Sequence, residues 1–238
     1  MLKVNYQNGA NILGEMIISF HDWLMVFVIS ISTVTLYTLV NLKSQYRYRN
    51  LMDSQLVEFL WTAIPVLILL AIVLPSLRLL YLVDSRTSSR LTVKAVGHQW
   101  YWQYDYPIGS TDSYLIGNPN YRLLEVDNRL MSPVEVSIQL LVSAADVLHS
   151  WTLPTIAVKA DAVPGRVNSL NLSPKRPGVY YGQCREICGS NHRFMPITME
   201  AFIFNQSVAL KVTITTVKRY RPNRAVARIM PSALLPVS

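Results

Sequence analysis

Two long stretches of the sequence contain no charged side chain. Trp23–Leu42 (WLMVFVISISTVTLYTLVNL) is twenty residues long, and Phe59–Leu77 (FLWTAIPVLILLAIVLPSL) is nineteen residues long. About 20 apolar residues, each rising 1.5 Å, cross a bilayer hydrocarbon core of roughly 30 Å. The sequence therefore predicts a transmembrane helix hairpin within residues 23–90, with helices over about 23–42 and 59–80, rather than two buried helices of a soluble core.

The loop between these two stretches is basic and carries Lys43, Arg47 and Arg49. Short basic loops are retained on the negative side of a membrane. The N-terminal segment 1–22 and the chain after Arg78 are therefore expected on the positive side. Thiols there lie outside the reducing compartment, which leaves a disulfide open as one use of the cysteines.

The excess of positive charge lies in the C-terminal part of the chain. The net charge is +8, and residues 206–238 carry six basic and no acidic side chains, whereas residues 91–205 carry nine of each. On a membrane-anchored chain such a tail favours anionic lipid or an acidic neighbouring subunit over nucleic acid, so no nucleic-acid partner is expected. A solvated tail without a partner remains equally open.

Residues 91–205 have the pattern of an all-β domain. Short segments such as LTVKAV, VEVSIQLLV (134–142) and ITMEAFI alternate apolar and polar residues, and Gly/Pro/Asn/Ser clusters separate them. The region GVYYGQ also resembles a strand, and KVTITTV predicts a last strand inside 206–238, ahead of a basic extension. Several short strands without helical repeats predict a small Greek-key sandwich or barrel.

One segment concentrates residues that bind soft metals. Cys184, Cys188, His192 and Met195 fall within YGQCREICGSNHRFMP, and the chain has only two cysteines. Thiolate, imidazole and thioether together favour copper over calcium, magnesium or manganese, and a thioether argues against zinc. A loop with one thiolate at the rim of a β-sandwich builds a single-copper electron-transfer site. A second thiolate would let two sulfurs bridge two metals.

A copper pair needs a second imidazole from outside this loop. His149 follows the expected strand 134–142 and is the first candidate, and His98 in GHQWYW is the second. Each of these histidines could instead be a hydrogen-bonded structural residue, and the two cysteines could instead form a disulfide. The joint occurrence of all these residue types favours copper.

Four motifs carry a resemblance to a known family. GHQWYWQYDY, RLLEVDNR, DVLHSW and YGQCREICGSNHRFMP resemble cytochrome c oxidase subunit 2 of the mitochondrial type, over nearly the whole chain except about the last thirty residues. The resemblance implies a cupredoxin-like domain with a dinuclear copper A centre. Such a subunit accepts single electrons from reduced cytochrome c and passes them to haem a in subunit 1. That partner reduces oxygen to water and pumps protons, so this chain alone is not the complete enzyme.

The resemblance also implies a location and partners. The chain would be a two-pass protein of the mitochondrial inner membrane, with both termini and the copper domain in the intermembrane space. Its partners would be subunits 1 and 3, accessory subunits, cytochrome c and membrane lipid.

The ligand set follows from the same resemblance. Cys184 and Cys188 would bridge both coppers. One copper would add His149 and Met195, and the other would add His192 and one backbone carbonyl.

Three further roles are implied by resemblance. The backbone carbonyl that binds copper would be that of Glu186. The carboxylate of Glu186 would help to bind a magnesium ion shared with subunit 1, because a carboxylate is a hard ligand and magnesium is a hard cation. Trp100 would be the exposed ring at which an electron from haem c enters. Glu58 would lie at the mouth of a proton path, although its position alone favours a simple marker of the membrane interface.

Carboxylates around the copper loop would dock cytochrome c, and the matching positions are Asp105, Asp112, Asp127 and Asp146. The sequence departs from the family here, because Ala145 stands where an acidic residue is frequent and Arg185 and Arg193 flank the ligands. A weaker electrostatic dock with a shallower salt dependence is expected.

Other classes of protein give different expectations. A membrane-tethered copper chaperone of the Sco type also uses Cys-x₃-Cys with a distant histidine, but it would have one span and a thioredoxin-like αβ pattern. A quinol oxidase subunit of the same fold would lack the copper ligands. A structural anchor closed by a disulfide is the third alternative.

Overall fold

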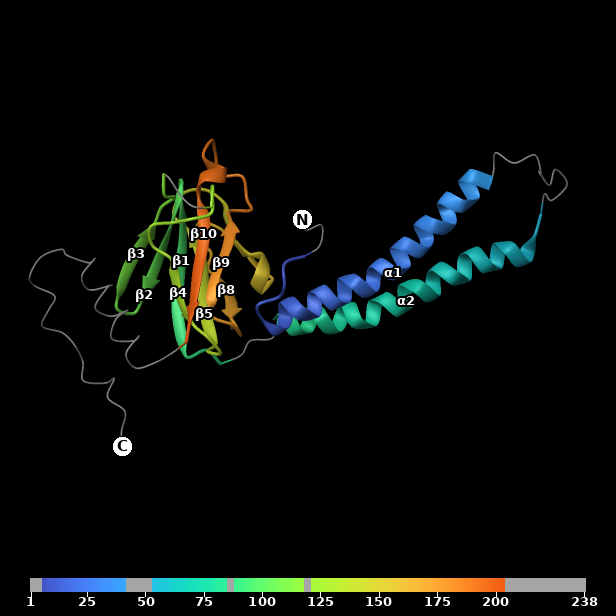
Figure 1. The fold of residues 1–238 in the computed structure, drawn as a ribbon, viewed down its shortest axis with the longest axis horizontal. Coiled ribbons are helices and arrows are strands. Elements are labelled where there is room, and N and C mark those ends of the chain that lie inside the picture. The colour runs from blue at the N-terminus through green and yellow to red at the C-terminus, as the bar shows by residue number, and fades with distance from the viewer. Residues whose placement is uncertain (1–5, 42–52, 85–87, 118–120, 204–238) are drawn as a thin grey trace, which may run out of the picture.

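Two long helices precede a β-domain in the computed structural model, which describes residues 6–41, 53–84, 88–117 and 121–203 (Figure 1). Helix α1 spans Ile12–Asn41 and helix α2 spans Gln55–Asp84. The basic loop and the expected last strand and tail lie outside the described residues.

Both helices are predominantly apolar and are long enough to cross a bilayer. Gly14 is the only residue of α1 that is buried, and no residue of α2 is buried. Helices without a buried face in the chain itself are those that lipid and neighbouring membrane proteins cover. Pro65 and Pro75 lie within α2, as packed membrane helices tolerate.

Helix α1 begins well before the first apolar stretch. Asn11 precedes it, and its Oδ1 accepts a hydrogen bond of 2.6 Å from the N–H of Gly14, the geometry of an N-cap. The expected segment 1–22 therefore supplies the first turns of α1, and α2 extends to Asp84. Hydropathy marks the part of a helix that lies in the hydrocarbon, not where the helix itself starts.

In the part of the chain that the structure describes, the β-domain contains three small sheets. The largest has the order β3-β2-β1-β5-β8, the second has the order β4-β10-β9, and β6 and β7 form a hairpin. The strands are β1 (Leu91–His98), β2 (Tyr101–Tyr106), β3 (Gly109–Ser113), β4 (Leu130–Pro133), β5 (Ile138–Ala144), β6 (His149–Leu153), β7 (Val158–Ala162), β8 (Asn168–Leu172), β9 (Gly178–Gln183) and β10 (Pro196–Phe202).

The pairings mix parallel and antiparallel neighbours. Strand β1 pairs in parallel with β5, and β4 pairs in parallel with β10, whereas β9 and β10 are antiparallel. Parallel neighbours that are far apart in sequence require crossover connections. The expected all-β fold is confirmed.

The strand expected over 134–142 begins four residues later in the structure, at Ile138. Val134 and Glu135 form a turn, Glu135 has a φ of 60°, and the strand begins at Ile138. The alternation of VEVSIQ is real, but the N–H of Glu135 bonds to the carbonyl of Pro174, outside the strand ladder.

The core lies between the sheets and reaches the end of the domain that carries the cysteines. Fully buried side chains from all three sheets contribute to it, among them Trp102, Leu140, Trp151, Ile197 and Met199. Strand β6 approaches β9 closely at Gly182, where an added Cβ would lie 1.9 Å from the carbonyl oxygen of Thr152. That close approach sets the start of β6 beside the loop that follows β9.

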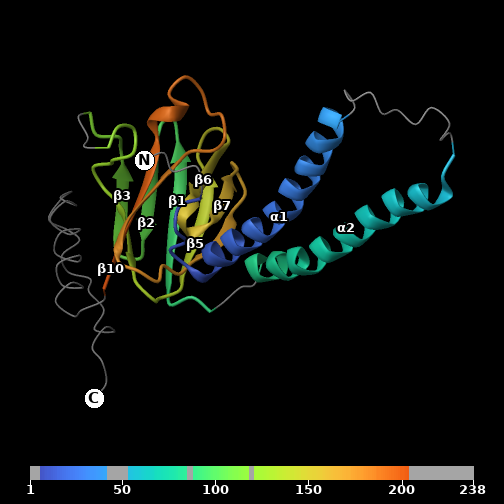
Figure 2. The same ribbon diagram turned by 45° about the vertical axis from the view of Figure 1, so that its right-hand side comes forward.

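Residues 9–15, which we call the N-terminal strap, bind the β-domain (Figure 2). The N–H of Ala10 donates to the carbonyl of Thr155 at 2.7 Å, and the N–H of Lys175 donates to the carbonyl of Ala10 at 2.8 Å. Lys175 also forms an ion pair of 3.4 Å with Glu15. Ala10 is almost fully buried at this contact.

Candidate metal centre

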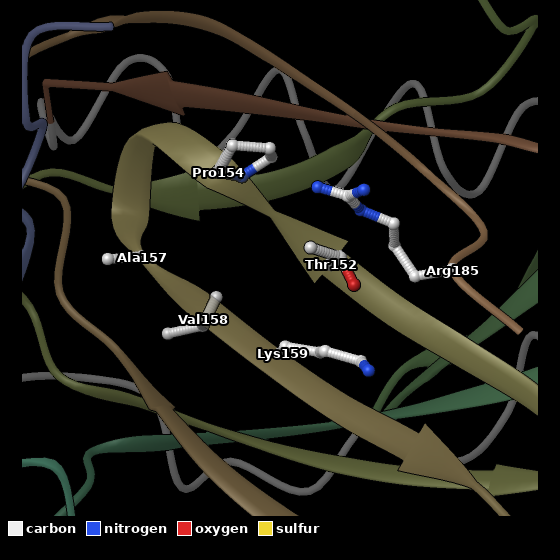
Figure 3. Close-up of a pocket in the computed structure, with 6 residues that line it drawn as sticks. All are labelled: Thr152, Pro154, Ala157, Val158, Lys159 and Arg185. Atoms are coloured by element: carbon white, nitrogen blue, oxygen red, sulfur yellow. The ribbon is translucent and has the colours of Figure 1, made fainter. Parts of the chain in front are cut away.

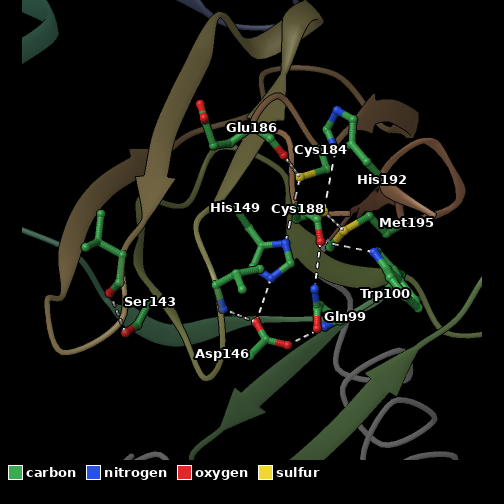
Figure 4. Close-up of polar contacts among 12 residues, drawn as sticks. Gln99, Trp100, Ser143, Asp146, His149, Cys184, Glu186, Cys188, His192 and Met195 are labelled. Atoms are coloured by element: carbon green, nitrogen blue, oxygen red, sulfur yellow. Dashed lines mark hydrogen bonds and ion pairs between the residues drawn. The ribbon is translucent and has the colours of Figure 1, made fainter. Parts of the chain in front are cut away.

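The cysteines lie on the connection between two antiparallel strands. Strand β9 ends at Gln183 and β10 begins at Pro196, so residues 184–195 form a loop whose two ends are held by the sheet. The N–H of Arg185 donates to the carbonyl of Ser150 at 3.1 Å, which fastens this loop along β6. His149 is the first residue of β6, and the loop and β6 therefore meet at one end of the domain (Figure 4).

Cys184 lies between a histidine and a backbone carbonyl. Its Sγ is 4.0 Å from Nδ1 of His149 and 3.4 Å from the carbonyl oxygen of Glu186. The ligand atoms of His149, Cys184 and Cys188 all lie within 4.8 Å of one another, and all three residues are buried. This is the spacing of side chains that could share a metal.

Cys188 has a second histidine and a thioether beside it. Its Sγ is 3.5 Å from Nδ1 of His192 and 3.4 Å from Sδ of Met195. Both cysteines are free thiols. The six residues expected as ligands thus converge, and each sulfur has an imidazole of its own.

The proton chemistry of the two thiols is asymmetric. Burial raises the pKa of Cys184, but hydrogen bonds with His149 and with the Ser150 and Glu186 backbone outweigh burial, so the pKa lies below its usual range. Burial and the adjacent Cys184 raise the pKa of Cys188. Two thiolates side by side in a buried site need a cation between them, so metal binding would release the protons.

A carboxylate orients the imidazole of His149. Oδ1 of Asp146 lies 2.8 Å from Nε2 of His149, and the same carboxylate accepts backbone N–H bonds from Gln99 and Val147, each of 2.6 Å. Trp102 packs edge-on against this ring at a centroid distance of 5.9 Å. These contacts leave Nδ1 directed at Cys184.

The backbone of β1 also lies directly against the imidazole ring of His149. A Cβ at Gly97 would lie 2.8 Å from Cδ2 of His149, so only glycine fits there. Neither Gly97 nor the orienting role of Asp146 was anticipated from the sequence. The spacing of Asp146, three residues before a candidate ligand, was the one available indication.

Trp100 packs against the ligand loop. Its Nε1–H donates to the carbonyl of Cys188 at 3.3 Å, and Nε2 of Gln99 donates to the same oxygen at 2.8 Å. The indole is half-buried and lines a pocket of about 460 Å³ with Tyr114 and Phe194 among its walls.

The other histidine candidate is elsewhere. His98 stacks on Tyr101 with a centroid distance of 4.6 Å, and it is absent from the group of close ligand atoms found in the described part of the chain. His149, and not His98, is the histidine whose ring lies close to both sulfurs, and its role as the second imidazole ligand stays a prediction.

The four expected docking carboxylates differ in what they contact. The carboxylate of Asp146 already bonds His149 and the backbone N–H groups of Gln99 and Val147. Asp127 accepts N–H bonds of 2.7 Å from Tyr114 and from the following residue, and Asp105 accepts a bond of 2.8 Å from Gln103. Asp112 is exposed.

The two glutamates with expected roles lie far apart. The carboxylate of Glu186 points away from the sulfurs (Figure 4). Glu58 lies in the first turn of α2, at the end of the hairpin remote from the β-domain (Figure 1).

Comparisons with known proteins cover both parts of the chain. Residues 1–79 match the family described as "Cytochrome C oxidase subunit II, transmembrane domain", and residues 91–202 match "Cytochrome C oxidase subunit II, periplasmic domain". A cytochrome c oxidase subunit 2 of Choristoneura rosaceana is 45% identical over 225 residues, which cover 91% of this chain and 96% of that protein. One from Apis mellifera ligustica is 44% identical, over 84% of this chain and 92% of that protein.

Solved structures agree with these relatives. The periplasmic domain of subunit II of cytochrome oxidase from Bradyrhizobium japonicum is 39% identical, with a TM-score of 0.54, and the match covers 57% of this chain and 99% of that one. A subunit II of cytochrome c oxidase, solved as a mixed disulfide intermediate with a thioredoxin-like protein, is 37% identical, with a TM-score of 0.51 and coverage of 58% and 98%. With two membrane helices, a cupredoxin-like domain and these relatives, the chain belongs to the cytochrome c oxidase subunit 2 family.

Proposed function

We propose that this chain relays single electrons from reduced cytochrome c through a dinuclear copper A centre to haem a in subunit 1. The observation that carries the proposal is the pair of free thiols, each within 4.0 Å of an imidazole nitrogen of its own. As a subunit 2, the chain is part of an oxidoreductase complex, and the oxygen-reducing site is assigned to subunit 1.

The donor set fits a copper pair better than one metal. His192 does not join the group of mutually close ligand atoms that contains His149 and both sulfurs, so the two imidazoles serve different positions. Two sulfurs between two imidazoles suit two metals that share the thiolates. The thioether of Met195 suits copper rather than zinc.

The six ligand groups divide between the two metal positions. Cys184 and Cys188 would hold both coppers, His149 and Met195 would complete one, and His192 and the carbonyl of Glu186 would complete the other. When bound, the copper pair supplies a one-electron redox centre.

The chain keeps the ligands fixed. Asp146 holds His149, the sheet holds both ends of the loop, and Gln99 holds the carbonyl of Cys188. A ligand set that moves little between redox states keeps the reorganisation energy low, which favours fast electron transfer.

Electron uptake is assigned to Trp100. Its indole N–H bonds directly to the backbone of a ligand residue, so a short bonded route leads from the ring to the sulfur of Cys188. Reduced cytochrome c would dock over this ring, with Asp105 and Asp112 as the carboxylates that have most freedom to meet a basic partner. Asp127 and Asp146 are assigned there by resemblance, although their oxygens already accept backbone bonds.

The remaining assignments concern the complex and its location. We assign the chain to the mitochondrial inner membrane, with the β-domain in the intermembrane space, and subunits 1 and 3, accessory subunits and lipid as neighbours. The carboxylate of Glu186 would bind magnesium at the contact with subunit 1, which agrees with its direction away from the sulfurs.

Glu58 is assigned to the mouth of a proton path on the opposite side of the membrane. Its position at the far end of the hairpin supports this side. Proton uptake that is unaffected by Glu58→Gln, measured in the reconstituted complex, would remove the role.

The Sco-type chaperone is not favoured. The chain has two membrane helices and an all-β domain rather than a single span and a thioredoxin-like fold. The ligand set also includes His192 and Met195 beside Cys188.

Metal analysis with an electron-spin spectrum tests the proposal. The purified complex should hold two coppers assigned to this chain and give a mixed-valence spectrum, and Cys184→Ser or Cys188→Ser should abolish that spectrum. One copper, or none, in a folded wild-type chain would refute the relay.

A further inference from the structure

A cationic pocket lies beside the metal loop but is not used by the proposed relay (Figure 3). Its volume is about 360 Å³, and it lies between the β6–β7 hairpin and the loop that follows β9. The lining residues are Thr152, Pro154, Ala157, Val158, Lys159 and Arg185. Among the residues that the structure describes, none that lines the pocket is acidic.

Two cations and a hydroxyl line this pocket. Thr152 and Lys159 are directly opposite each other in the register of β6 and β7, so their side chains are cross-strand neighbours. Arg185 follows Cys184, and its backbone bond to Ser150 fixes the base of its side chain along β6.

The polar groups of the pocket have unused bonding capacity. Thr152 is 6% exposed, and its buried Oγ1 has no hydrogen-bond partner within the described chain. Arg185 makes no ion pair with any residue that the structure describes. Lys159 has only a loose contact of 3.8 Å with Asp161, and both side chains are 56% exposed. A buried hydroxyl without a partner costs free energy unless a ligand supplies one.

The fold determines which partner can reach the pocket. Figure 2 shows β6 and β7 on the side of the β-domain that faces α1. Pro154 lines the pocket, and the adjacent Thr155 accepts the backbone bond from Ala10 of the N-terminal strap. The pocket therefore lies level with the first turn of α1, beside the membrane hairpin.

The distance of this position from the uncharged part of α1 favours a protein over a lipid as the occupant. From Ile12 to the first apolar stretch at Trp23, α1 runs eleven residues, or about 16 Å of axis. The headgroup layer is only about 5 to 8 Å thick on each side. A membrane protein that projects above the bilayer reaches this level directly, and we therefore take an acidic protein side chain rather than a lipid phosphate as the occupant.

We propose that this pocket takes an aspartate or glutamate side chain of a membrane protein that lies beside the α1–α2 hairpin and extends above the bilayer. A carboxylate accepts charge-assisted bonds from Arg185 and Lys159, and the buried Oγ1 of Thr152, which has no partner within the described chain, donates a third once its side chain turns toward the pocket. The inference relies on the proposed function only in taking that neighbour to be another subunit of the oxidase. The acidic partner would connect the ligand loop to the β6–β7 hairpin, because Arg185 belongs to the loop and Thr152 and Lys159 belong to the hairpin.

Zero-length cross-linking of the intact complex with a carbodiimide tests this pocket, because the reagent joins an amine only to a carboxylate in contact with it. Peptide mapping should find Lys159 joined to an acidic residue of a neighbouring membrane subunit. Lys159→Arg keeps the charge and should remove the product. Arg185→Glu should lower its yield about tenfold, and Thr152→Val should lower it as well, whereas Arg166→Glu, an exposed cation on another loop, should leave it unchanged.

Copper content, measured in the same preparations, separates this proposal from the relay. Unchanged yields in both Arg185→Glu and Thr152→Val overturn the pocket, as does a wild-type complex in which Lys159 reacts only within its own chain. Phospholipid that is lost specifically from Arg185→Glu, with no link to protein, overturns it in favour of a lipid. A specific link in a wild-type complex without two coppers leaves the pocket intact and refutes the relay.

Discussion

Asp146 holds a carboxylate oxygen 2.8 Å from Nε2 of His149, whose other ring nitrogen faces the sulfur of Cys184. Burial opposes ionisation of this carboxyl, but bonds from His149 and two backbone N–H groups outweigh it and lower the pKa of Asp146. An ionised carboxylate keeps the proton on Nε2, which leaves Nδ1 free as a ligand. The tautomer of His149 is thus set by a residue outside the ligand set.

Replacement of Asp146 by alanine should weaken copper retention about 10- to 100-fold, the usual effect of removing a group that orients a metal-binding histidine. Copper retained against a competing chelator measures this. Asp112→Ala removes an exposed carboxylate and serves as the matched control. Equal retention by the two variants would contradict the orienting role.

Gly97→Ala should disturb the same histidine from the opposite side. The new Cβ would lie 2.8 to 3.0 Å from three atoms of His149, so the ring or strand β1 has to move. Overpacking of this kind costs about 1–3 kcal/mol, and the copper spectrum should change with it. Gly117→Ala, where nothing lies within 4 Å of the added atom, should leave both stability and spectrum unaltered.

Trp100→Phe should slow electron uptake from cytochrome c while the copper spectrum remains. The substitution removes the N–H that donates to the carbonyl of Cys188, but Gln99 still holds that oxygen. Stopped-flow reduction of the complex by reduced cytochrome c is the measurement. An unchanged rate would move electron uptake away from this ring.

The Michaelis constant for cytochrome c should rise only gently with ionic strength. Asp146 and Asp127 already accept backbone bonds, and Arg193 adds positive charge to the ligand loop. With few free carboxylates, the electrostatic attraction of cytochrome c is weak, so added salt has little attraction to screen. A steep dependence in a titration of turnover would show a stronger acidic dock than the one assigned.

The β-domain should lose stability in alkali. Burial raises the pKa of Tyr106 to about 12, and its Oη accepts a hydrogen bond of 2.9 Å from the N–H of Met131. The folded chain holds this proton more tightly than the unfolded chain, whose tyrosine pKa is about 10. The contribution is complete below pH 10 and is lost as the pH rises towards 12.

Urea midpoints of the β-domain in the complex at pH 8 and pH 11 check the effect of Tyr106. Tyr106→Phe should lower stability by about 1–3 kcal/mol at pH 8, because the N–H of Met131 loses its partner. The same variant should lose less stability between the two pH values than the wild type does. Tyr121→Phe, at an exposed ring, should behave as the wild type, and equal alkaline losses in all three chains would contradict the assignment to Tyr106.

The ligand loop was predictable because its chemistry is rare. Two cysteines, a histidine and a methionine close together have few uses, and the structure places Cys184, Cys188, His192 and Met195 side by side. His149 was predictable to the extent that it follows an expected strand. The residues that position these ligands are of common types, and glycine at 97 or aspartate at 146 has no distinctive pattern in one sequence.

The same contrast holds for the fold. Runs of apolar residues reveal what lies in hydrocarbon, so the hairpin was predictable, but the start of α1 depends on Asn11 and on contacts of Ala10 with the β-domain. Alternation reveals which face of a segment is buried, not where its ladder begins. The turn at Glu135 is held by a backbone bond to Pro174, 39 residues further along the chain, so no local pattern indicates it.

Ala10 forms backbone bonds with both Thr155 and Lys175. The β-domain is therefore attached to the hairpin at two places, through the covalent junction after α2 and through the residues that precede α1. A domain attached at a single point can rotate in any direction. A domain attached at two points can rotate only about the line that joins those points. The β-domain can therefore turn relative to the hairpin only about the line between these two attachments, which limits the positions that the loop with both cysteines can take above the membrane helices.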